Sequence, residues 1–304
     1  MARVDASGRP YTGRLDPANL RTDVTPSEIG FANIQWSGRP VRIEYQWLHA
    51  RERAAPLIVF LHEGLGSLAM WREFPQALCQ AARCRGLVYS RPGYGRSTPR
   101  EAHEAWGVDF MHRQAHEVLP ALFAALQVDP AAQPLWLFGH SDGGSIALLY
   151  AARNSAHLAG AIVVAPHIVV EDISVQSILK ARDVYVQTGF RQRLARYHDD
   201  PDSAFWGWNR VWQLPEFRDW SIEAEIKAIA CPLLAVQGLA DEYGTLEQIR
   251  GIARCVAHAE LLELAECGHS PHRDQADTLI AASRDFVARH TRAERTPANH
   301  RAGE

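Results

Sequence analysis

Residues 134–146 read Pro-Leu-Trp-Leu-Phe-Gly-His-Ser-Asp-Gly-Gly-Ser-Ile and place Ser141 in a Gly-x-Ser-x-Gly pattern. A short apolar run precedes the pattern and an Ala/Leu-rich stretch follows it, which predicts a strand, a tight turn and a helix. In such a turn the serine has a strained backbone, and Gly139 and Gly143 let strand and helix approach because they carry no Cβ. The exposed hydroxyl predicts a nucleophilic serine.

The segments around this turn alternate between strands and helices. Apolar runs predict strands over 57–62, 86–90, 135–138, 161–165, 232–237 and 260–264. Helical spacing predicts helices over 71–83, 109–126, 146–153, 245–255 and 271–290, with Pro120 as an irregularity in the second. Strands over 32–37 and 41–50 precede them, joined by a Gly38-Arg39-Pro40 turn. This pattern predicts an α/β fold, with a mostly parallel sheet covered by helices on both faces.

The alternation stops between the sixth strand and about residue 229. Helical patterns cover 175–188 and 190–197, and an aromatic-rich stretch follows over 205–212. We therefore expect a helical cap over 167–229, inserted after the sixth strand into a core formed by 31–166 and 230–291. The remaining segments, 1–30 and 292–304, are a polar N-terminal extension and a polar tail.

The composition excludes several classes of partner. The chain has 304 residues, 47% of them hydrophobic, which is enough for one large α/β domain with an inserted subdomain. A formal charge of −3 without a basic cluster argues against nucleic acid and anionic membranes as partners.

No signal-peptide core and no run of ~20 apolar residues is present, so we expect a cytoplasmic protein. Five cysteines without paired spacing indicate neither a disulfide framework nor a zinc site.

The nucleophile needs a histidine base, and the histidine needs a carboxylate to orient it. Asp241 follows the strand predicted over 232–237, and His269 follows the strand over 260–264. Both lie at the carboxyl ends of strands, where an open α/β sheet gathers its chemistry. Glu242 is an alternative acid, and His272 an alternative base.

The serine turn and the order Ser141, Asp241, His269 resemble the α/β-hydrolase superfamily over about residues 32–290. The resemblance implies an oxyanion hole with one N–H from Asp142 and a second from the loop His62-Glu63-Gly64-Leu65-Gly66-Ser67, which is similar to a His-Gly-x-x-Gly loop. Glu63 departs from that pattern. Gly64 is the expected donor and Leu65 the alternative. The segment 90–97 also resembles a family loop, and we assign it no chemistry.

Two acidic residues and several tryptophans mark the region expected around the serine. Glu63 and Asp142 would oppose a developing oxyanion unless they are turned away or neutralised. Glu63 is expected either to pair with an arginine such as Arg91, to cap a turn, or to recognise a substrate. Trp206, Trp208 and Trp212 are expected to line an apolar pocket or to form the core of the cap.

These features predict a cap-bearing serine hydrolase that cleaves an ester or lactone of a small, apolar or aromatic molecule through an acyl-enzyme. It needs no metal or organic cofactor, and its partner is the small-molecule substrate. The alternative is hydrolysis of a carbon–carbon bond or a thioester with the same triad. A non-catalytic ligand receptor on the same fold is a more distant alternative. The sequence does not indicate an oligomeric state.

Overall fold

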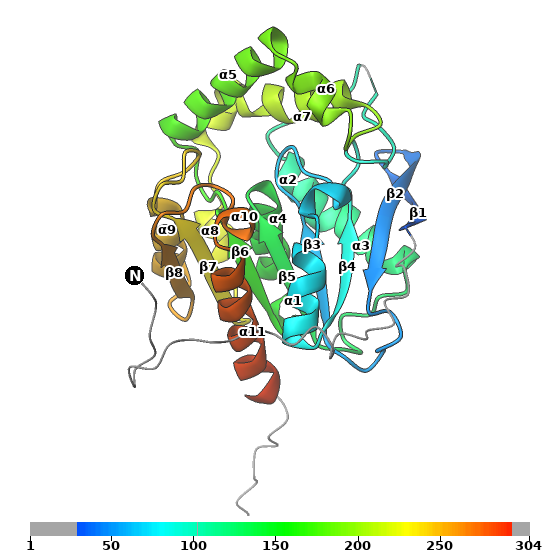
Figure 1. The fold of residues 1–304 in the computed structure, drawn as a ribbon, viewed down its shortest axis with the longest axis vertical. Helices are drawn as coiled ribbons and strands as arrows, with labels where there is room; N and C mark the ends of the chain where they lie inside the picture. Colours follow the sequence, from blue (N-terminus) through cyan, green and yellow to red (C-terminus); the bar gives the residue numbers. More distant parts are fainter. Residues whose placement is uncertain (1–28, 102, 294–304) are drawn as a thin grey trace, which may run out of the picture.

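The computed structural model describes residues 29–101 and 103–293, so the predicted polar segments 1–30 and 292–304 lie almost entirely outside it. Its centre is an eight-stranded sheet with the order β1-β2-β4-β3-β5-β6-β7-β8 (Figure 1). The strands are β1 (Ile29–Trp36), β2 (Arg39–Leu48), β3 (Leu57–Leu61), β4 (Arg85–Tyr89), β5 (Leu135–His140), β6 (Gly160–Val164), β7 (Leu233–Gly238) and β8 (Glu260–Leu264).

The sheet is parallel except at β2, which runs antiparallel to both β1 and β4. This confirms the predicted mostly parallel sheet. The predicted hairpin is present, but its turn is formed by Ser37 and Gly38, whose φ angles are 52° and 75°. Two positive φ angles match the twist of the flanking strands. Arg39 and Pro40 already pair with Trp36 and Gln35, so the turn predicted over Gly38-Arg39-Pro40 was placed too late.

Helices cover both faces of the sheet (Figure 1). In the core they are α1 (Phe74–Ala82), α2 (Phe110–Arg113), α3 (Leu119–Ala125), α4 (Asp142–Asn154), α8 (Glu223–Ile226), α9 (Glu247–Cys255), α10 (Pro271–Asp274) and α11 (Ala276–Ala293), with the 3-10 turns η2 (Leu68–Trp71) and η4 (Ser155–His157). All five residues of β3 are buried, and they alternate between two apolar clusters, with Ile58 and Phe60 in one and Leu57, Val59 and Leu61 in the other. A strand buried on both faces reads as a continuous apolar run for this reason.

The helix predicted over 109–126 is divided at its middle. Between α2 and α3 lies the π-helical turn η3 (Gln114–Val118). Pro120, at the second position of α3, has no N–H to donate to the carbonyl four residues earlier, and its ring crowds that carbonyl. A locally wider turn accommodates the proline without ending the helix.

Between β6 and β7 the chain forms α5 (Asp172–Gln187), α6 (Phe190–Leu194) and α7 (Pro201–Trp212), followed by the 3-10 turn η5 (Pro215–Asp219). We call α5, α6 and α7 the inserted helices. They lie together above the sheet, at the end where β5 leads into α4 (Figure 1). The aromatic stretch 205–212 belongs to α7, which begins where the Asp200 carboxylate accepts the Ser203 N–H at 2.9 Å and Pro201 occupies the first helical position.

Candidate active site

Ser141 stands between the end of β5 and the start of α4, in the strand, turn and helix predicted for it. Its φ is 53°, the strained left-handed region for a residue with a side chain. A Cβ on Gly139 would lie 2.2 Å from the Gly143 carbonyl oxygen, and one on Gly143 would lie 2.0 Å from the Leu61 carbonyl oxygen. The two glycines therefore allow a contact between backbones that no other residue permits.

Three side chains from separate loops form a hydrogen-bonded chain with Ser141 at its end. The Ser141 Oγ lies 3.0 Å from His269 Nε2, and His269 Nδ1 lies 2.9 Å from Asp241 Oδ1. Because a carboxylate only accepts, Nδ1 carries the proton and Nε2 is free to accept the serine proton. This arrangement can activate a serine hydroxyl as a nucleophile.

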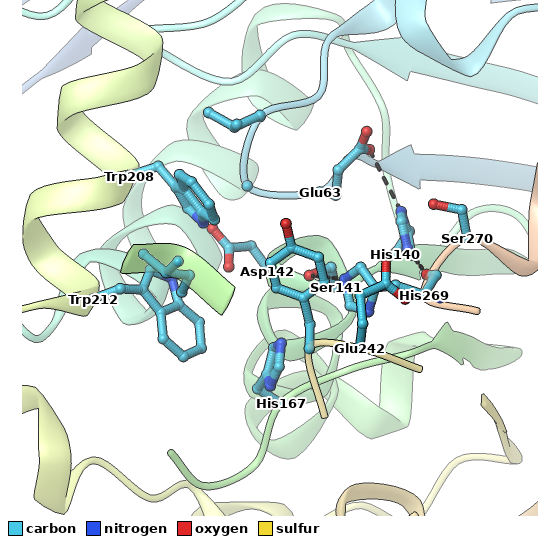
Figure 2. A pocket seen from close by; sticks show the side chains of 14 residues that line it. Glu63, His140, Ser141, Asp142, His167, Trp208, Trp212, Glu242, His269 and Ser270 are labelled. Atoms are coloured by element: carbon cyan, nitrogen blue, oxygen red, sulfur yellow. Dashed lines mark hydrogen bonds and ion pairs between the residues drawn. The ribbon is translucent and has the colours of Figure 1, made fainter. Parts of the chain in front are cut away.

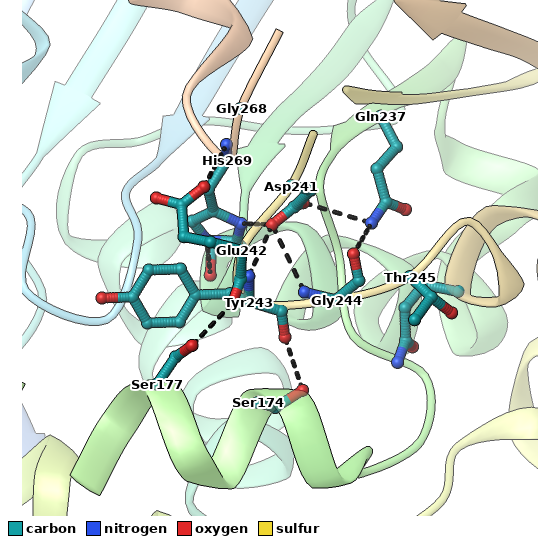
Figure 3. A network of polar contacts seen from close by, with 12 residues as sticks. Ser174, Ser177, Gln237, Asp241, Glu242, Tyr243, Gly244, Thr245, Gly268 and His269 are labelled. Atoms are coloured by element: carbon teal, nitrogen blue, oxygen red, sulfur yellow. Dashed lines mark hydrogen bonds and ion pairs between the residues drawn. The ribbon is translucent and has the colours of Figure 1, made fainter. Parts of the chain in front are cut away.

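The acid loop after β7 holds Asp241 with several donors (Figure 3). Asp241 Oδ1 accepts the N–H groups of Tyr243 at 2.8 Å and Gly244 at 3.3 Å, and Oδ2 accepts the Gln237 amide at 3.1 Å. Burial would raise the pKa of Asp241, but His269 and the backbone donors hold the pKa below its usual value. The carboxylate is therefore charged at neutral pH.

The two alternative residues lie elsewhere. The Glu242 carboxylate accepts the main-chain N–H of His269 at 3.1 Å, not its ring. The ring of His272 packs against Trp71, with ring centroids 5.1 Å apart, and against His140 at 4.7 Å. Of the candidates, Asp241 and His269 are thus the pair that the fold brings to Ser141.

Helix α5 supports the acid loop through two serine side chains (Figure 3). The hydroxyl of Ser174 donates to the Tyr243 carbonyl, and that of Ser177 donates to the Glu242 carbonyl at 2.6 Å. The inserted helices therefore contact the loop that orients the histidine.

The loop after β3 holds one peptide group in a fixed direction. The Glu63 carbonyl accepts His62 Nδ1–H at 2.7 Å and the Arg91 guanidinium at 2.8 Å. His62 Nε2 accepts the Arg91 N–H at 3.0 Å, so His62 is neutral, and burial lowers its pKa well below 6.5. In a trans peptide the N–H points opposite to the carbonyl. The Gly64 N–H therefore points away from Arg91.

The Glu63 side chain lies near an arginine, as one of the expectations had it, but the arginine is Arg273 and the named example, Arg91, is wrong. The Glu63 carboxylate lies 3.5 Å from His140 Nδ1 (Figure 2). It also lies 3.6 Å from the Arg273 guanidinium. Burial would raise the pKa of Glu63, but the contact with His140 and the neighbouring imidazoles hold it well below its usual range. The reason for the correction is that Arg91 approaches the main-chain side of Glu63. His140 Nε2–H in turn donates to the His269 carbonyl at 2.7 Å.

The Arg91 guanidinium faces the side chain of Asp142 instead of that of Glu63. It lies 3.6 Å from the Asp142 carboxylate, and the two side chains are 0% and 1% exposed. Burial raises the pKa of Asp142, while the charge of Arg91 opposes that rise. Arg91 lies in the segment 90–97, to which the sequence assigned no chemistry.

A cavity of about 240 Å³ lies beside Ser141 (Figure 2). Its apolar wall includes Leu65, Ile178, Trp208 and Trp212, and its polar lining includes Glu63, Asp142, His167 and Glu242.

The expectation that Trp206 lines the pocket is wrong, because Trp206 is not among the residues that line this cavity. Trp208 and Trp212 are four residues apart on one face of α7, whereas a residue two positions before Trp208 points the opposite way. Trp206 packs edge-on against Phe205, at 5.0 Å between ring centroids, inside the inserted helices.

Two histidines that were not predicted as site residues, His140 and His167, also line the cavity. His140 is the neighbour of Ser141, and His167 follows the strand predicted over 161–165. The rule that selected Asp241 and His269, a polar residue just past the carboxyl end of a strand, applies equally to His167.

Two features are absent from the described part of the chain. Residues 29–101 and 103–293 contain no group of three or more His, Cys, Asp or Glu side chains placed to hold a metal ion. Over the same residues, no helix combines the length and apolar character needed to cross a membrane.

Comparison with known proteins gave consistent matches. Residues 58–282 match the model of the alpha/beta hydrolase family. Protein phosphatase methylesterase 1 of Bos taurus is 28% identical over 99 residues, 33% of this chain but only 24% of the methylesterase. The 2-succinyl-6-hydroxy-2,4-cyclohexadiene-1-carboxylate synthase of Klebsiella pneumoniae (strain 342) is 25% identical over 253 residues, 77% of this chain and 94% of the synthase. The enol-lactonase of Burkholderia xenovorans LB400 shares the fold, with a TM-score of 0.65 and 22% identity over 85% of this chain and 100% of the lactonase.

Proposed function

Because the chain belongs to the alpha/beta hydrolase family, we propose that this hydrolase cleaves a carboxylic ester or lactone of a small molecule, with Ser141 as its nucleophile. The observation that carries the proposal is the hydrogen-bonded chain from Ser141 through His269 to Asp241, with links of 3.0 and 2.9 Å. The three residues lie on loops after β5, β7 and β8, beside one cavity. In this proposal the inserted helices form a cap over that cavity. Helix α8, although it lies within the expected cap range 167–229, packs against α4 and α9 of the core instead.

In the first half of the reaction, the Ser141 Oγ attacks the carbonyl carbon while His269 Nε2 takes the serine proton. The charged Asp241 stabilises the imidazolium that forms. The tetrahedral intermediate then expels the alcohol, which leaves with the proton from His269. Water, activated by His269, attacks the acyl-enzyme in the second half and releases the acid.

The developing oxyanion needs two N–H donors. We assign them to Asp142 and Gly64. The Asp142 N–H lies at the start of α4, where helix N–H groups are free and the helix dipole is positive. The hydrogen bonds from His62 and Arg91 fix the Glu63 carbonyl and thereby turn the Gly64 N–H away from Arg91. This orientation favours Gly64 over Leu65 as the second donor. The charge of Arg91 also offsets the Asp142 carboxylate, which would otherwise oppose the oxyanion.

The cavity favours a compact substrate. At about 240 Å³ it is smaller than the ~300–1,000 Å³ of drug-sized ligand sites. Trp208 and Trp212 supply an apolar surface for a short aliphatic or aromatic group. The likeness to an enol-lactonase and to a methylesterase agrees with ester chemistry.

A second candidate is hydrolysis of a carbon–carbon bond or a thioester, which uses the same serine attack on a carbonyl. The likeness to the cyclohexadiene-carboxylate synthase extends over 77% of the chain, and by its name that relative is not an esterase, so the test includes substrates other than esters.

The experiment measures hydrolysis of a panel that contains a short ester, a lactone, a thioester and a β-diketone, by wild type and Ser141→Ala. The proposal predicts turnover of the ester or the lactone. It also predicts a loss of ~10⁴–10⁶ in kcat in the variant, with an unchanged melting temperature. Turnover of only the diketone or the thioester would favour the second candidate. Wild-type activity in Ser141→Ala would refute the serine mechanism, and an inactive wild type with tight ligand binding would favour a receptor.

A further inference from the structure

His167 is a buried histidine that the proposed mechanism does not use. It follows β6 and is 3% exposed. Its N–H donates to the Ser145 Oγ at 3.0 Å, and the same hydroxyl donates to the His167 carbonyl at 2.6 Å. Ser145 is itself fully buried in α4, so the main chain of His167 is fixed to the helix that carries Ser141.

The imidazole of His167 lies in the wall of the cavity, between Trp212 and Glu242 in the view of Figure 2. Its ring centroid is 4.9 Å from that of Trp212, in edge-to-face contact, and 6.0 Å from that of His269. A substrate group beside this ring would therefore lie only a few bonds from the carbonyl that Ser141 attacks.

No hydrogen bond to the His167 ring is present among the described residues, and its Nδ1 is buried without a partner. Burial, together with the neighbouring imidazole of His269, lowers the pKa of His167 to about 3. The ring is therefore neutral and offers one N–H donor and one acceptor nitrogen. An unpaired buried polar group costs free energy that an apolar side chain of similar size would avoid.

The charges around the cavity restrict what such a ring can bind. Three carboxylates line it, from Glu63, Asp142 and Glu242, and its lining within the described residues contains no lysine or arginine. The charge of Asp142 is offset by Arg91 and that of Glu63 by Arg273, so the cavity carries no excess positive charge for an anion. A neutral oxygen that can hydrogen-bond satisfies the ring without an unpaired charge.

We propose that His167 forms a polar subsite that binds a hydroxyl or keto oxygen of the substrate, so that the substrates are small, uncharged hydroxy- or oxo-esters. This rests on the proposed function. A hydroxyl can accept from the ring N–H in one tautomer or donate to the unprotonated nitrogen in the other, whereas a keto oxygen can only accept from the N–H. The apolar wall of Trp208 and Trp212 would hold the rest of the molecule.

The experiment compares four esters of similar size by pH-stat titration: ethyl butyrate, ethyl 3-hydroxybutyrate, ethyl acetoacetate and 2-hydroxyethyl butyrate. The second and third carry the oxygen on the acyl side, and the fourth carries it on the alcohol side. We expect wild type to show kcat/KM for at least one oxygenated ester that is ~10–100-fold above that for ethyl butyrate. His167→Phe should reduce that ratio to near one.

His167→Asn keeps a donor and an acceptor near the same place and should retain part of the preference. This variant tests the subsite even where the phenylalanine does not fold. His272→Phe is the matched control, because His272 is also buried and both of its ring nitrogens lack partners, yet it does not line the cavity. It should leave the ratio unchanged, whatever it does to the melting temperature.

The subsite is overturned if wild type shows no preference among the esters, or if His167→Phe keeps the preference. It is also overturned if His272→Phe removes the preference as fully as His167→Phe. Those results leave the serine mechanism standing as long as Ser141→Ala is inactive. A wild type that hydrolyses none of the four esters contradicts the proposed function, and the subsite with it.

Discussion

The candidate site has two halves that come from different parts of the fold. The hydrogen-bonded residues Ser141, Asp241 and His269 lie on loops that follow strands of the sheet. The apolar wall, with Ile178, Trp208 and Trp212, comes largely from the inserted helices. Parallel strands end at one edge of a sheet, so the register of the sheet brings the first set together. The wall depends on how helices pack above that edge.

This difference separates reaction class from substrate choice. The polar half determines which bond chemistry is possible, and small changes there should reduce every activity together. The half from the inserted helices sets which molecules fit, so changes there should alter selectivity. The contacts of Ser174 and Ser177 with the acid loop join the halves.

Within the polar half, the largest effect after loss of the serine itself is expected at the acid. Asp241→Asn should lower kcat by ~10²–10⁴ with little change in KM, because the amide can hold His269 in the wrong tautomer. Glu242→Gln is the matched control and should have a small effect, since its carboxylate contacts only the His269 main chain. Steady-state kinetics on one ester measure both. A large loss in Glu242→Gln with a small one in Asp241→Asn would reverse the assignment.

Arg91→Met tests the support of the oxyanion donors. It should lower kcat by about 10–10³-fold, because the Glu63–Gly64 peptide loses one of its two fixed contacts near the oxyanion. It should also cost roughly 3–5 kcal/mol of stability, because Asp142 is left buried without its cation.

Arg91→Met/Asp142→Asn separates these two consequences. The double variant should recover much of the stability measured by denaturant unfolding while kcat stays low. Recovery of kcat along with stability would mean that Arg91 acts only through the neutralisation of Asp142.

Trp208→Ala and Trp206→Ala test the half of the site that comes from the inserted helices. Removing Trp208 from the cavity wall should change KM several-fold and alter the ranking of acyl chain lengths, with a smaller change in kcat. Trp206→Ala should lower the melting temperature and leave the ranking intact, because Trp206 packs against Phe205 and Tyr185 instead. An altered ranking in Trp206→Ala would contradict the placement of this residue.

The smallest effect expected is that of Glu63→Gln. Because its carboxylate contacts His140 and Arg273, the variant should lower stability modestly and reduce activity evenly across substrates. The folded-state pKa of Glu63 lies below the ordinary 4.5. Its charge therefore stabilises the fold fully above about pH 4.5, and that stabilisation disappears as the pH falls through the lower folded-state pKa. Melting curves of the two proteins should converge in acid.

A loss confined to one polar or amine-bearing substrate, with an unchanged melting temperature, would instead make Glu63 a recognition group.

The sequence predicted the features that depend on local pattern. The apolar runs gave the strands, and the glycines around Ser141 predicted a close approach of backbones that the structure contains. It could not predict the direction of side chains that meet across the fold. Arg91 was expected as a partner of the Glu63 carboxylate, yet it contacts the carbonyl of that residue. The three tryptophans were grouped because they are close in sequence, and the helical period then separated Trp206 from the others.

Labelling with a fluorophosphonate followed by peptide mapping shows whether Ser141 is the reacting nucleophile. We expect a stoichiometric adduct on Ser141 in wild type, no adduct in Ser141→Ala, and slower labelling in Asp241→Asn. An adduct on another residue, or undiminished labelling of Ser141→Ala, would show that Ser141 is not the nucleophile.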